Sequence, residues 1–179
     1  MATDAAGEPA ADPAGDLWRF ALALYGRPGV SGRCLMLQDR HGCDVTVLLF
    51  AAWAGAARGI GLSAQDLAAA RTAVEAWHEE VVRPLRAVRR RLKHGPPPAP
   101  SGRTGELRAG IQAIEIEAER IELEVLAGRL PAAAASGQPS PELVLANLQL
   151  VVPDLEEEGR EALRAIAGTA YSIGSAIEL

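Results

Sequence analysis

The first residues whose types suit chemistry are two cysteines and a histidine that lie close together in the chain. Cys34, His41 and Cys43 are metal-ligand types, and Asp39 and Asp44 stand beside them. The common zinc sites use cysteines in close pairs, so this wider spacing is not typical of them. If the segment is helical, the two thiols lie about 13 Å apart, which is too far for a disulfide. We interpret the cysteines as buried thiols and the histidine as a cap at a helix end.

A second group of potential ligands spans two predicted helices. It comprises Glu75, His78 and Glu79 on one helix and Glu115, Glu119 and Glu122 on the next. The Glu-x-x-His motif occurs in bundles that bind two iron ions, but those sites need a second such motif, which this chain lacks. Trp77 and a seam beginning at Leu107 are expected to fill the inward face, so we expect the carboxylates to face solvent. The sequence therefore predicts no metal site and no cofactor.

A basic stripe forms the third group. Arg83, Arg86, Arg90 and Lys93 recur at spacings of three and four residues, which places them on one face of a helix. In the expected antiparallel pairing, Arg83 lies near Ile114 and Arg90 near Leu107, so the facing helix leaves the stripe incompletely neutralised. Such a basic tip is suited to an acidic protein partner or a phosphate-bearing ligand. The alternatives are a solvated face or pairing with the C-terminal acids Glu156, Glu157, Glu158 and Glu161.

Gln38 and Asp39 are polar residues next to a strongly apolar stretch. A partly buried Gln or Asp needs hydrogen-bonding partners. The two residues either serve the structure, by capping a helix or pairing with an arginine, or line a small polar pocket. Both interpretations stay open at this point.

Composition and the absence of common catalytic motifs give reasons against several classes of function. The chain has 179 residues and a net charge of -5, which gives no general reason to expect nucleic acid as a partner. It contains no nucleophile elbow, no Walker loop and no dinucleotide-binding glycine motif. Residues 1–14 lack the basic start and apolar centre of a signal peptide, so we expect a cytoplasmic protein.

The element that must position these groups is the apolar run 45–57, in which Thr46 is the sole polar side chain. A helix that is apolar all round is buried in a protein or in a membrane, and this run is too short for a typical span of about 20 residues. We predict a central buried helix without membrane insertion. Gly42 suits the end of the preceding helix, and Asp44 suits the N-cap of this one.

The remaining expected elements surround that helix. Asp16 is read as the N-cap of a helix over 17–25, and Pro28 opens a second helix that ends near 41. Ser63 begins a long helix towards 93, which Pro84 is expected to kink. A long helix over 104–130 pairs with it in an antiparallel hairpin. The seam of this helix, meaning the face expected to contact its partner, is predicted from apolar residues at alternating spacings of four and three. These are Leu107, Ile111, Ile114, Ala118, Ile121 and Val125.

Together these elements predict an organisation in four parts. They are a disordered leader over 1–15, a helical bundle core over 16–130, a flexible linker over 131–141 and a C-terminal helical appendage over 142–179. The fold class is all-α, a bundle of about five to seven helices with a long antiparallel helical hairpin.

The chain also resembles a bacterial family of conserved proteins known under a domain-of-unknown-function label, number 2390. The resemblance lies in CLMLQD at 34–39, GCDVTVLLFAAW at 42–53 and VVRPLRAVRRRLK at 81–93, and it covers roughly residues 16–130. The family pattern has Asn at the position of Thr46. The resemblance implies a small all-helical protein and supplies no activity and no catalytic residues.

Two functions follow as hypotheses. The first is a non-enzymatic interaction or regulatory protein that uses the basic hairpin tip or the C-terminal tail. The second is a small helical enzyme or ligand-binding protein with a polar pocket near Gln38 and Asp39. A closed, well-packed interior favours the first, and a sizeable pocket with free polar groups favours the second. The oligomeric state is left open.

Overall fold

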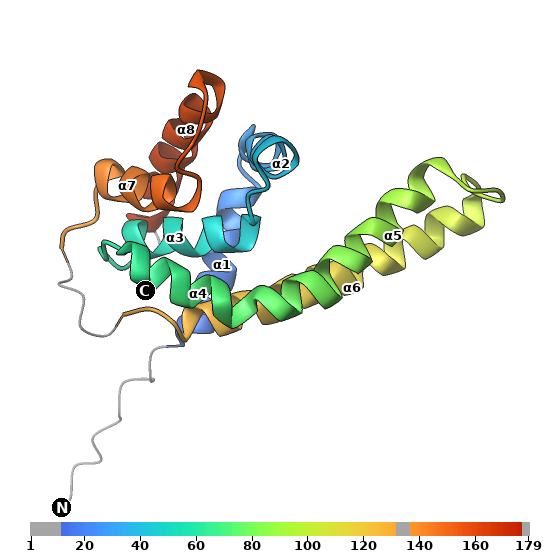
Figure 1. Ribbon diagram of the computed structural model, residues 1–179, viewed down its shortest axis with the longest axis horizontal. Helices are drawn as coiled ribbons and strands as arrows, with labels where there is room; N and C mark the ends of the chain where they lie inside the picture. Colours follow the sequence, from blue (N-terminus) through green and yellow to red (C-terminus); the bar gives the residue numbers. More distant parts are fainter. Residues whose placement is uncertain (1–11, 132–136, 177–179) are drawn as a thin grey trace, which may run out of the picture.

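The computed structural model describes residues 12–131 and 137–176, and these parts are all-α (Figure 1). The helices are α1 (Pro13–Tyr25), α2 (Val30–His41), α3 (Val45–Ala56), α4 (Ala64–Trp77), the π-helix η1 (His78–Val82), α5 (Arg83–His94), α6 (Gly102–Ala127), α7 (Pro141–Val151) and α8 (Glu157–Gly174). The predicted all-α fold class is confirmed. None of the described helices has the length and apolar character needed to cross a membrane.

α3 is the centre of the core. All of its residues from Thr46 to Ala56 are buried, and α1, α6, α7 and α8 pack around it. Asp44 caps its first turn by accepting the backbone N–H of Thr46 at 2.9 Å. Gly42 ends α2 in the left-handed conformation, at φ 64°. The predicted central helix and both boundary residues are therefore confirmed.

α1 begins earlier than the sequence analysis indicates. Asp12, not Asp16, is the N-cap, and it accepts the N–H of Gly15 at 3.1 Å. Pro13 takes the first helical position, where its missing N–H costs nothing. Asp16 is buried instead and pairs with Arg58 at 2.7 Å. Residues 1–11 of the expected leader lie outside the described residues.

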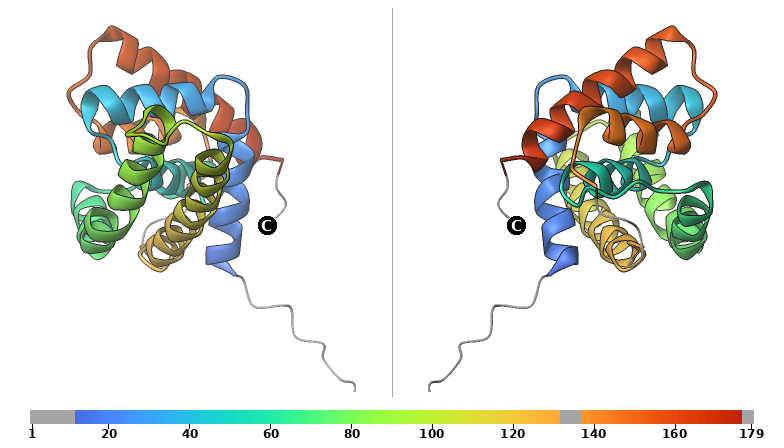
Figure 2. Two further views of the ribbon diagram at one scale, coloured as in Figure 1. Left: turned by 90° about the vertical axis from the view of Figure 1, so that its right-hand side faces the viewer. Right: turned by 90° about the vertical axis from the view of Figure 1, so that its left-hand side faces the viewer.

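The C-terminal helices share the core with α3 (Figure 2). A Cβ at Gly55 would lie 3.0 Å from the Cα of Val144, so α3 and α7 approach closely there. The buried Asn147 donates to the carbonyls of Ala51 (3.2 Å) and Ile60 (2.9 Å). Asn147 thus bonds to one carbonyl within α3 and one in the segment after it, which fixes α7 against both. Residues 132–136 of the expected linker lie outside the described residues.

Pro84 follows a widened turn of helix. Proline has no N–H, and its ring clashes with the carbonyl four residues before it. The N–H of Arg83 bonds to the carbonyl of His78, five residues earlier, which defines the π-helix η1. The wider turn lets the helix continue through Pro84 as α5. Single π turns of this kind are frequent at functional sites.

The predicted seam of α6 is wrong except at Ala118, which is buried as expected. Leu107, Ile114, Ile121 and Val125 are exposed, whereas the buried positions are Glu115, Ala118, Glu122, Leu123, Leu126 and Ala127. Neighbouring residues of a helix point about 100° apart, so the buried stripe at 115 and 122 is rotated by that angle from the predicted one at 114 and 121. The inward face contains carboxylates because polar partners on other helices meet them there.

α5 and α6 lie side by side and run in opposite directions. His78, in η1 just before α5, contacts Glu122, and Arg89 on α5 contacts Glu115, so residue numbers rise along η1 and α5 as they fall along α6. Their far ends extend away from the rest of the bundle (Figure 1). The near half of α6 packs against α1, α3 and α4. This half positions the groups described next.

Candidate functional site

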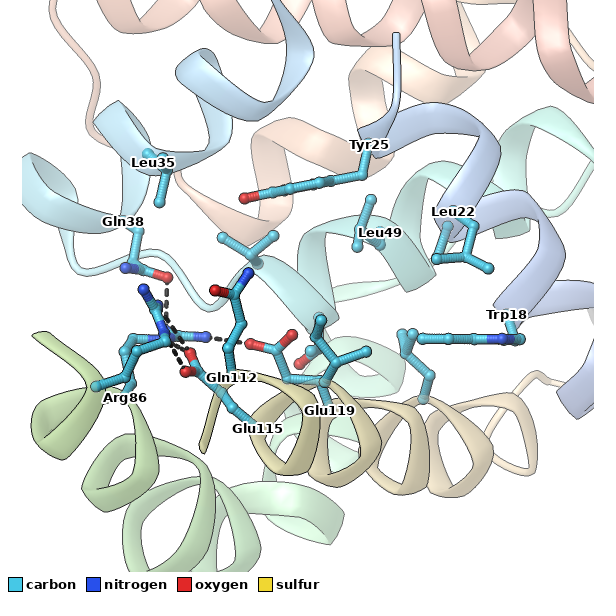
Figure 3. Close-up of a pocket in the computed structure, with 16 residues that line it drawn as sticks. Trp18, Leu22, Tyr25, Leu35, Gln38, Leu49, Arg86, Gln112, Glu115 and Glu119 are labelled. Carbon is cyan, nitrogen blue, oxygen red and sulfur yellow. Dashed lines mark hydrogen bonds and ion pairs between the residues drawn. The ribbon is translucent and has the colours of Figure 1, made fainter. Parts of the chain in front are cut away.

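A cavity of about 340 Å³ lies between α1, α2, α3 and the α5–α6 pair (Figure 3). Five elements contribute its lining, which consists of Trp18, Ala21, Leu22, Tyr25, Leu35, Gln38, Val45, Thr46, Leu49, Arg86, Arg89, Gln112, Glu115, Ile116, Glu119 and Leu123. A volume of this size falls at the lower end of small-molecule sites. The cavity is therefore large enough for a small organic ligand.

One side of the cavity is apolar. Trp18, Leu22 and Tyr25 project from one face of α1, and Leu49 projects from α3 (Figure 3). Leu22 and Tyr25 remain partly exposed, so this side is accessible from solvent. Large apolar groups that stay exposed around a cavity favour contact with an apolar ligand.

The opposite side is polar and centres on Arg86, whose side chain is only 14% exposed. Its Nη1 donates to Gln38 Oε1 (2.6 Å), its Nε donates to Glu115 Oε1 (3.1 Å), and its Nη2 donates to Glu119. Arg89 donates to both oxygens of Glu115. The two arginines therefore compensate the charges of the buried Glu115 and the half-buried Glu119.

The two glutamates of this cluster titrate differently. Burial favours the neutral form of Glu115, but hydrogen bonds from Arg89 and Arg86 outweigh burial and lower its pKa. Burial raises the pKa of Glu119, and the nearby Arg86 only partly opposes that rise. Glu119 Oε2, the Tyr25 hydroxyl and the Gln112 amide make no hydrogen bond to any described residue and remain available to a ligand.

A second polar group lies behind Thr46, a residue that also lines the cavity. His78 Nδ1 lies 3.2 Å from Asp44 Oδ2 and 3.1 Å from Glu122 Oε1. The side chain of Glu122 is 0% exposed, that of His78 13% and that of Asp44 21%. Burial raises the pKa of Glu122, and the hydrogen bond between His78 and Glu122 raises the pKa of His78.

Thr46 joins the two carboxylates of this second group. Its Oγ1 lies 2.6 Å from Asp44 Oδ1 and 2.7 Å from Glu122 Oε1. The Thr46 hydroxyl has one proton, so it can donate a hydrogen bond to only one of the two carboxylates. It bonds to the other as well only if that carboxyl group is protonated and donates to it. The cluster is thus short of positive charge.

The structure separates the two residues of the predicted polar pocket. Gln38 lines the cavity and accepts from Arg86. Asp39 is exposed, lies outside the lining and pairs with Arg90 at 2.8 Å. A hydrogen bond from Arg90 lowers the pKa of Asp39.

The residues of the predicted basic stripe differ in their ion-pair partners. Arg86 faces Glu115 and Glu119 on α6, so the facing helix neutralises this one member of the stripe. Arg83 pairs with Glu79 at 2.6 Å on its own helical surface, and Arg90 pairs with Asp39. Lys93 is exposed and forms no ion pair within the described parts of the chain. The rotation of α6 turns Glu115 and Glu119 towards Arg86 and accounts for this pairing.

The first ligand group of the sequence analysis does not assemble. Cys34 and Cys43 are free and buried, and burial raises the pKa of each thiol to about 12. Across residues 12–131 and 137–176, the sole set of three such side chains with ligand atoms within 4.8 Å of one another is Asp44, His78 and Glu122. The expectation that the glutamates of α6 face solvent is wrong for Glu115 and Glu122.

Sequence reasoning missed Trp18, Tyr25 and Gln112 as cavity residues. A signal was present, because Trp18 and Tyr25 lie seven residues apart on one helix in a chain with 4% aromatic residues. It also named Asp44, His78 and Glu122 but assigned them to two separate groups. The N-cap role of Asp44 could have linked them, because a cap uses one carboxylate oxygen and leaves the other free.

No curated protein and no solved structure matches this chain. A family model matches residues 16–126, which contain the central helix and the residues of both polar groups. The matched region covers most of the chain and carries the motifs on which the resemblance was based. The chain therefore belongs to the family described as "Protein of unknown function (DUF2390)".

Proposed function

We propose that the protein binds a small amphipathic molecule in the cavity between α1, α2, α3 and the α5–α6 pair. The observation that supports this most directly is the juxtaposition of an apolar wall and free hydrogen-bonding groups around about 340 Å³. Ligand sites combine a mainly apolar lining with a few polar groups that orient the ligand. The proposal corresponds to the second hypothesis from the sequence, with Gln38 retained and Asp39 excluded.

The polar groups favour a ligand with a hydrogen-bond donor. The charges of Arg86 and Arg89 are already balanced by Glu115 and Glu119, so the pair adds no net positive charge that would attract an anion. Glu119 Oε2 is a free acceptor at the cavity wall. An ammonium or hydroxyl group can donate to it while an aromatic or aliphatic body packs against Trp18 and Leu49. We therefore expect amines to bind better than carboxylates of the same size.

The test compares phenethylamine with phenylacetate by calorimetric or NMR titration of the full chain. Phenethylamine should bind saturably, at about millimolar Kd or tighter for so small a probe, and phenylacetate more weakly. Leu22→Trp, which fills the exposed mouth, should abolish binding, and Glu119→Gln should weaken it about tenfold. Val88→Trp on α5 and Glu117→Gln on α6 are matched controls at exposed positions. Binding that persists in Leu22→Trp would contradict the proposal.

An interaction protein is the second candidate function, on a surface other than the predicted basic tip. Leu107, Ile114 and Ile121 recur every seven residues on α6 and are exposed. A seven-residue apolar repeat is typical of a seam that a second helix covers, and a copy of the same helix is self-complementary about a two-fold axis. The partner proposed here is a second copy of this chain. Sedimentation should show a dimer that Ile114→Glu dissociates, and a monomeric wild type would exclude it.

A further inference from the structure

Three side chains from distant parts of the chain converge behind the cavity. Asp44 is the N-cap of α3, His78 is the first residue of η1, and Glu122 lies in α6. Their ligand atoms all lie within 4.8 Å of one another. The set combines one imidazole nitrogen with two carboxylate oxygens, which are ligand types shared by zinc, manganese and iron sites.

The charge of this group is not balanced by the protein. Neither Asp44 nor Glu122 forms an ion pair with an arginine or lysine of the described residues, and each contacts only His78 among cationic groups. Even a protonated His78 leaves one net negative charge beside a fully buried carboxylate. A buried carboxylate without compensation is costly, so a further cation or proton is required.

Two of the three separations between the ligand atoms suit coordination to one cation, and all three are within 4.8 Å. Two ligand atoms bonded to one ion at about 2.1 Å, and about 90–110° apart, are themselves separated by about 3.0–3.4 Å. His78 Nδ1 lies 3.1 Å from Glu122 Oε1 and 3.2 Å from Asp44 Oδ2. These separations match the ones that coordination to a shared ion requires.

The surrounding residues hold the ligands in place. Asp44 Oδ1 accepts the backbone N–H groups of Thr46 (2.9 Å) and Val47 (3.4 Å), which leaves Oδ2 directed at His78. The Thr46 hydroxyl orients the Glu122 carboxylate at 2.7 Å. Partners of this kind fix ligand orientation in metal sites and are part of the site. Partial exposure of Asp44 and His78 gives an ion access from solvent.

We propose that Asp44, His78 and Glu122 bind one divalent first-row transition-metal ion, with Zn²⁺ as the reference case. This inference is independent of the small-molecule proposal and replaces the sequence-based prediction of no metal. Three protein ligands leave at least one coordination position for water, as in catalytic rather than structural zinc sites. Mg²⁺ prefers oxygen ligands and should bind much more weakly to a site with an imidazole.

The experiment titrates chelator-treated full-length protein with Zn²⁺, Co²⁺ and Mg²⁺ by calorimetry, with the visible spectrum of Co²⁺ as a second readout. About one equivalent of Zn²⁺ or Co²⁺ should bind. Glu122→Gln, His78→Gln and Asp44→Asn should each weaken binding at least about 100-fold, beyond the effect of changing an outer-shell partner. Asp44→Asn is the sharpest variant, because Asn also caps helices and preserves the fold.

Glu75→Gln is the matched control, since it removes the same charge from an exposed position one turn before His78. It should bind the ion as the wild type does. Wild-type protein that fails to take up Zn²⁺ or Co²⁺ saturably would refute the proposal, as would full affinity in Asp44→Asn and Glu122→Gln. Far-UV circular dichroism of each variant shows whether a lost site reflects lost ligands or a lost fold.

Discussion

The inward-facing glutamates of α6 contrast in how their charge is compensated. Glu115 and Glu119 lie opposite α5 and receive hydrogen bonds from Arg86 and Arg89. Glu122, two helical turns after Glu115, is more deeply buried but contacts a histidine and a threonine instead. The same residue type on the same face therefore belongs to two different electrostatic environments.

The contrast shows how compensation decides what a buried carboxylate can do. Arginine is protonated at all ordinary pH values, so the Arg86 cluster has a permanent cation and serves as a polar wall of the cavity. Histidine and threonine supply no permanent charge, so the Glu122 group must take up a proton or an ion. The charges of the first cluster are balanced by the protein itself, whereas those of the second are not.

The largest effect is expected from removing the permanent cation. Arg86→Ala removes the shared partner of the buried Glu115 and the half-buried Glu119, and breaking a buried pair costs about 3–5 kcal/mol of unfolding free energy. Denaturant unfolding measures this loss. Arg83→Ala is the control, because its pair with Glu79 is exposed and should contribute at most about 1 kcal/mol. Equal losses in the two variants would contradict the distinction between them.

The direct comparison of the two environments uses one substitution at two positions. Glu115→Gln should lower the unfolding free energy by about 2–3 kcal/mol, because it leaves two partly buried arginines with fewer acceptors. Glu122→Gln, in metal-free protein, should leave it unchanged or raise it by about 1 kcal/mol, since it removes an uncompensated charge and keeps the shape. A loss of similar size at both positions would show that the environments do not differ.

Acid should abolish the difference in unfolding free energy between the wild type and Glu115→Gln. Burial opposes ionisation of Glu115, but Arg89 and Arg86 nevertheless hold its pKa below the usual 4.5 in the folded chain. Its stabilising contribution is therefore complete above pH 4.5 and is lost as the pH falls below that value. The unfolding free energies of the wild type and of Glu115→Gln should converge as the pH is lowered. A constant difference down to acid unfolding would show that Glu115 is not held ionised by the arginines.

A smaller effect is expected from the hydroxyl that joins Asp44 and Glu122. Thr46→Val keeps the side-chain size and removes the only hydroxyl in contact with both carboxylates in the described structure. The metal-free protein should lose about 1.5 kcal/mol, the value of one hydrogen bond to a charged group. Thermal or chemical unfolding measures the change. An unaltered stability would mean that Thr46 does not hold Glu122.

The smallest effect is expected at the exposed pair of Asp39 and Arg90. Both side chains are about half exposed, and such pairs contribute roughly 0–1 kcal/mol. Arg90→Ala should therefore leave the unfolding free energy almost unchanged, and ligand titration should give the same affinity as in wild type. A loss approaching that of Arg86→Ala would place Arg90 in the buried cluster and contradict its assignment to the surface.

Local features of the fold could be predicted from the sequence. The run from Val45 to Ala56 is apolar on every side, so no choice of orientation exposes it to water, and the central helix follows. Gly42, Asp44 and Ser63 act on backbone groups within a few residues of themselves, and each forms the expected cap. Such interactions depend on residues that are neighbours in the chain and can therefore be predicted from the sequence.

The candidate sites depended on tertiary structure. Residues 114 and 115 of α6 differ by about 100° in direction, and both an apolar and a carboxylate stripe run along this helix at helical spacing. Periodicity favours burying Ile114, but the arginines of α5 make burial of Glu115 favourable, and no local rule weighs these alternatives. The rotation of α6 then brings Glu122 to His78 and Asp44. Long-range charge pairing, set by helices far apart in sequence, decided both the cavity wall and the proposed metal site.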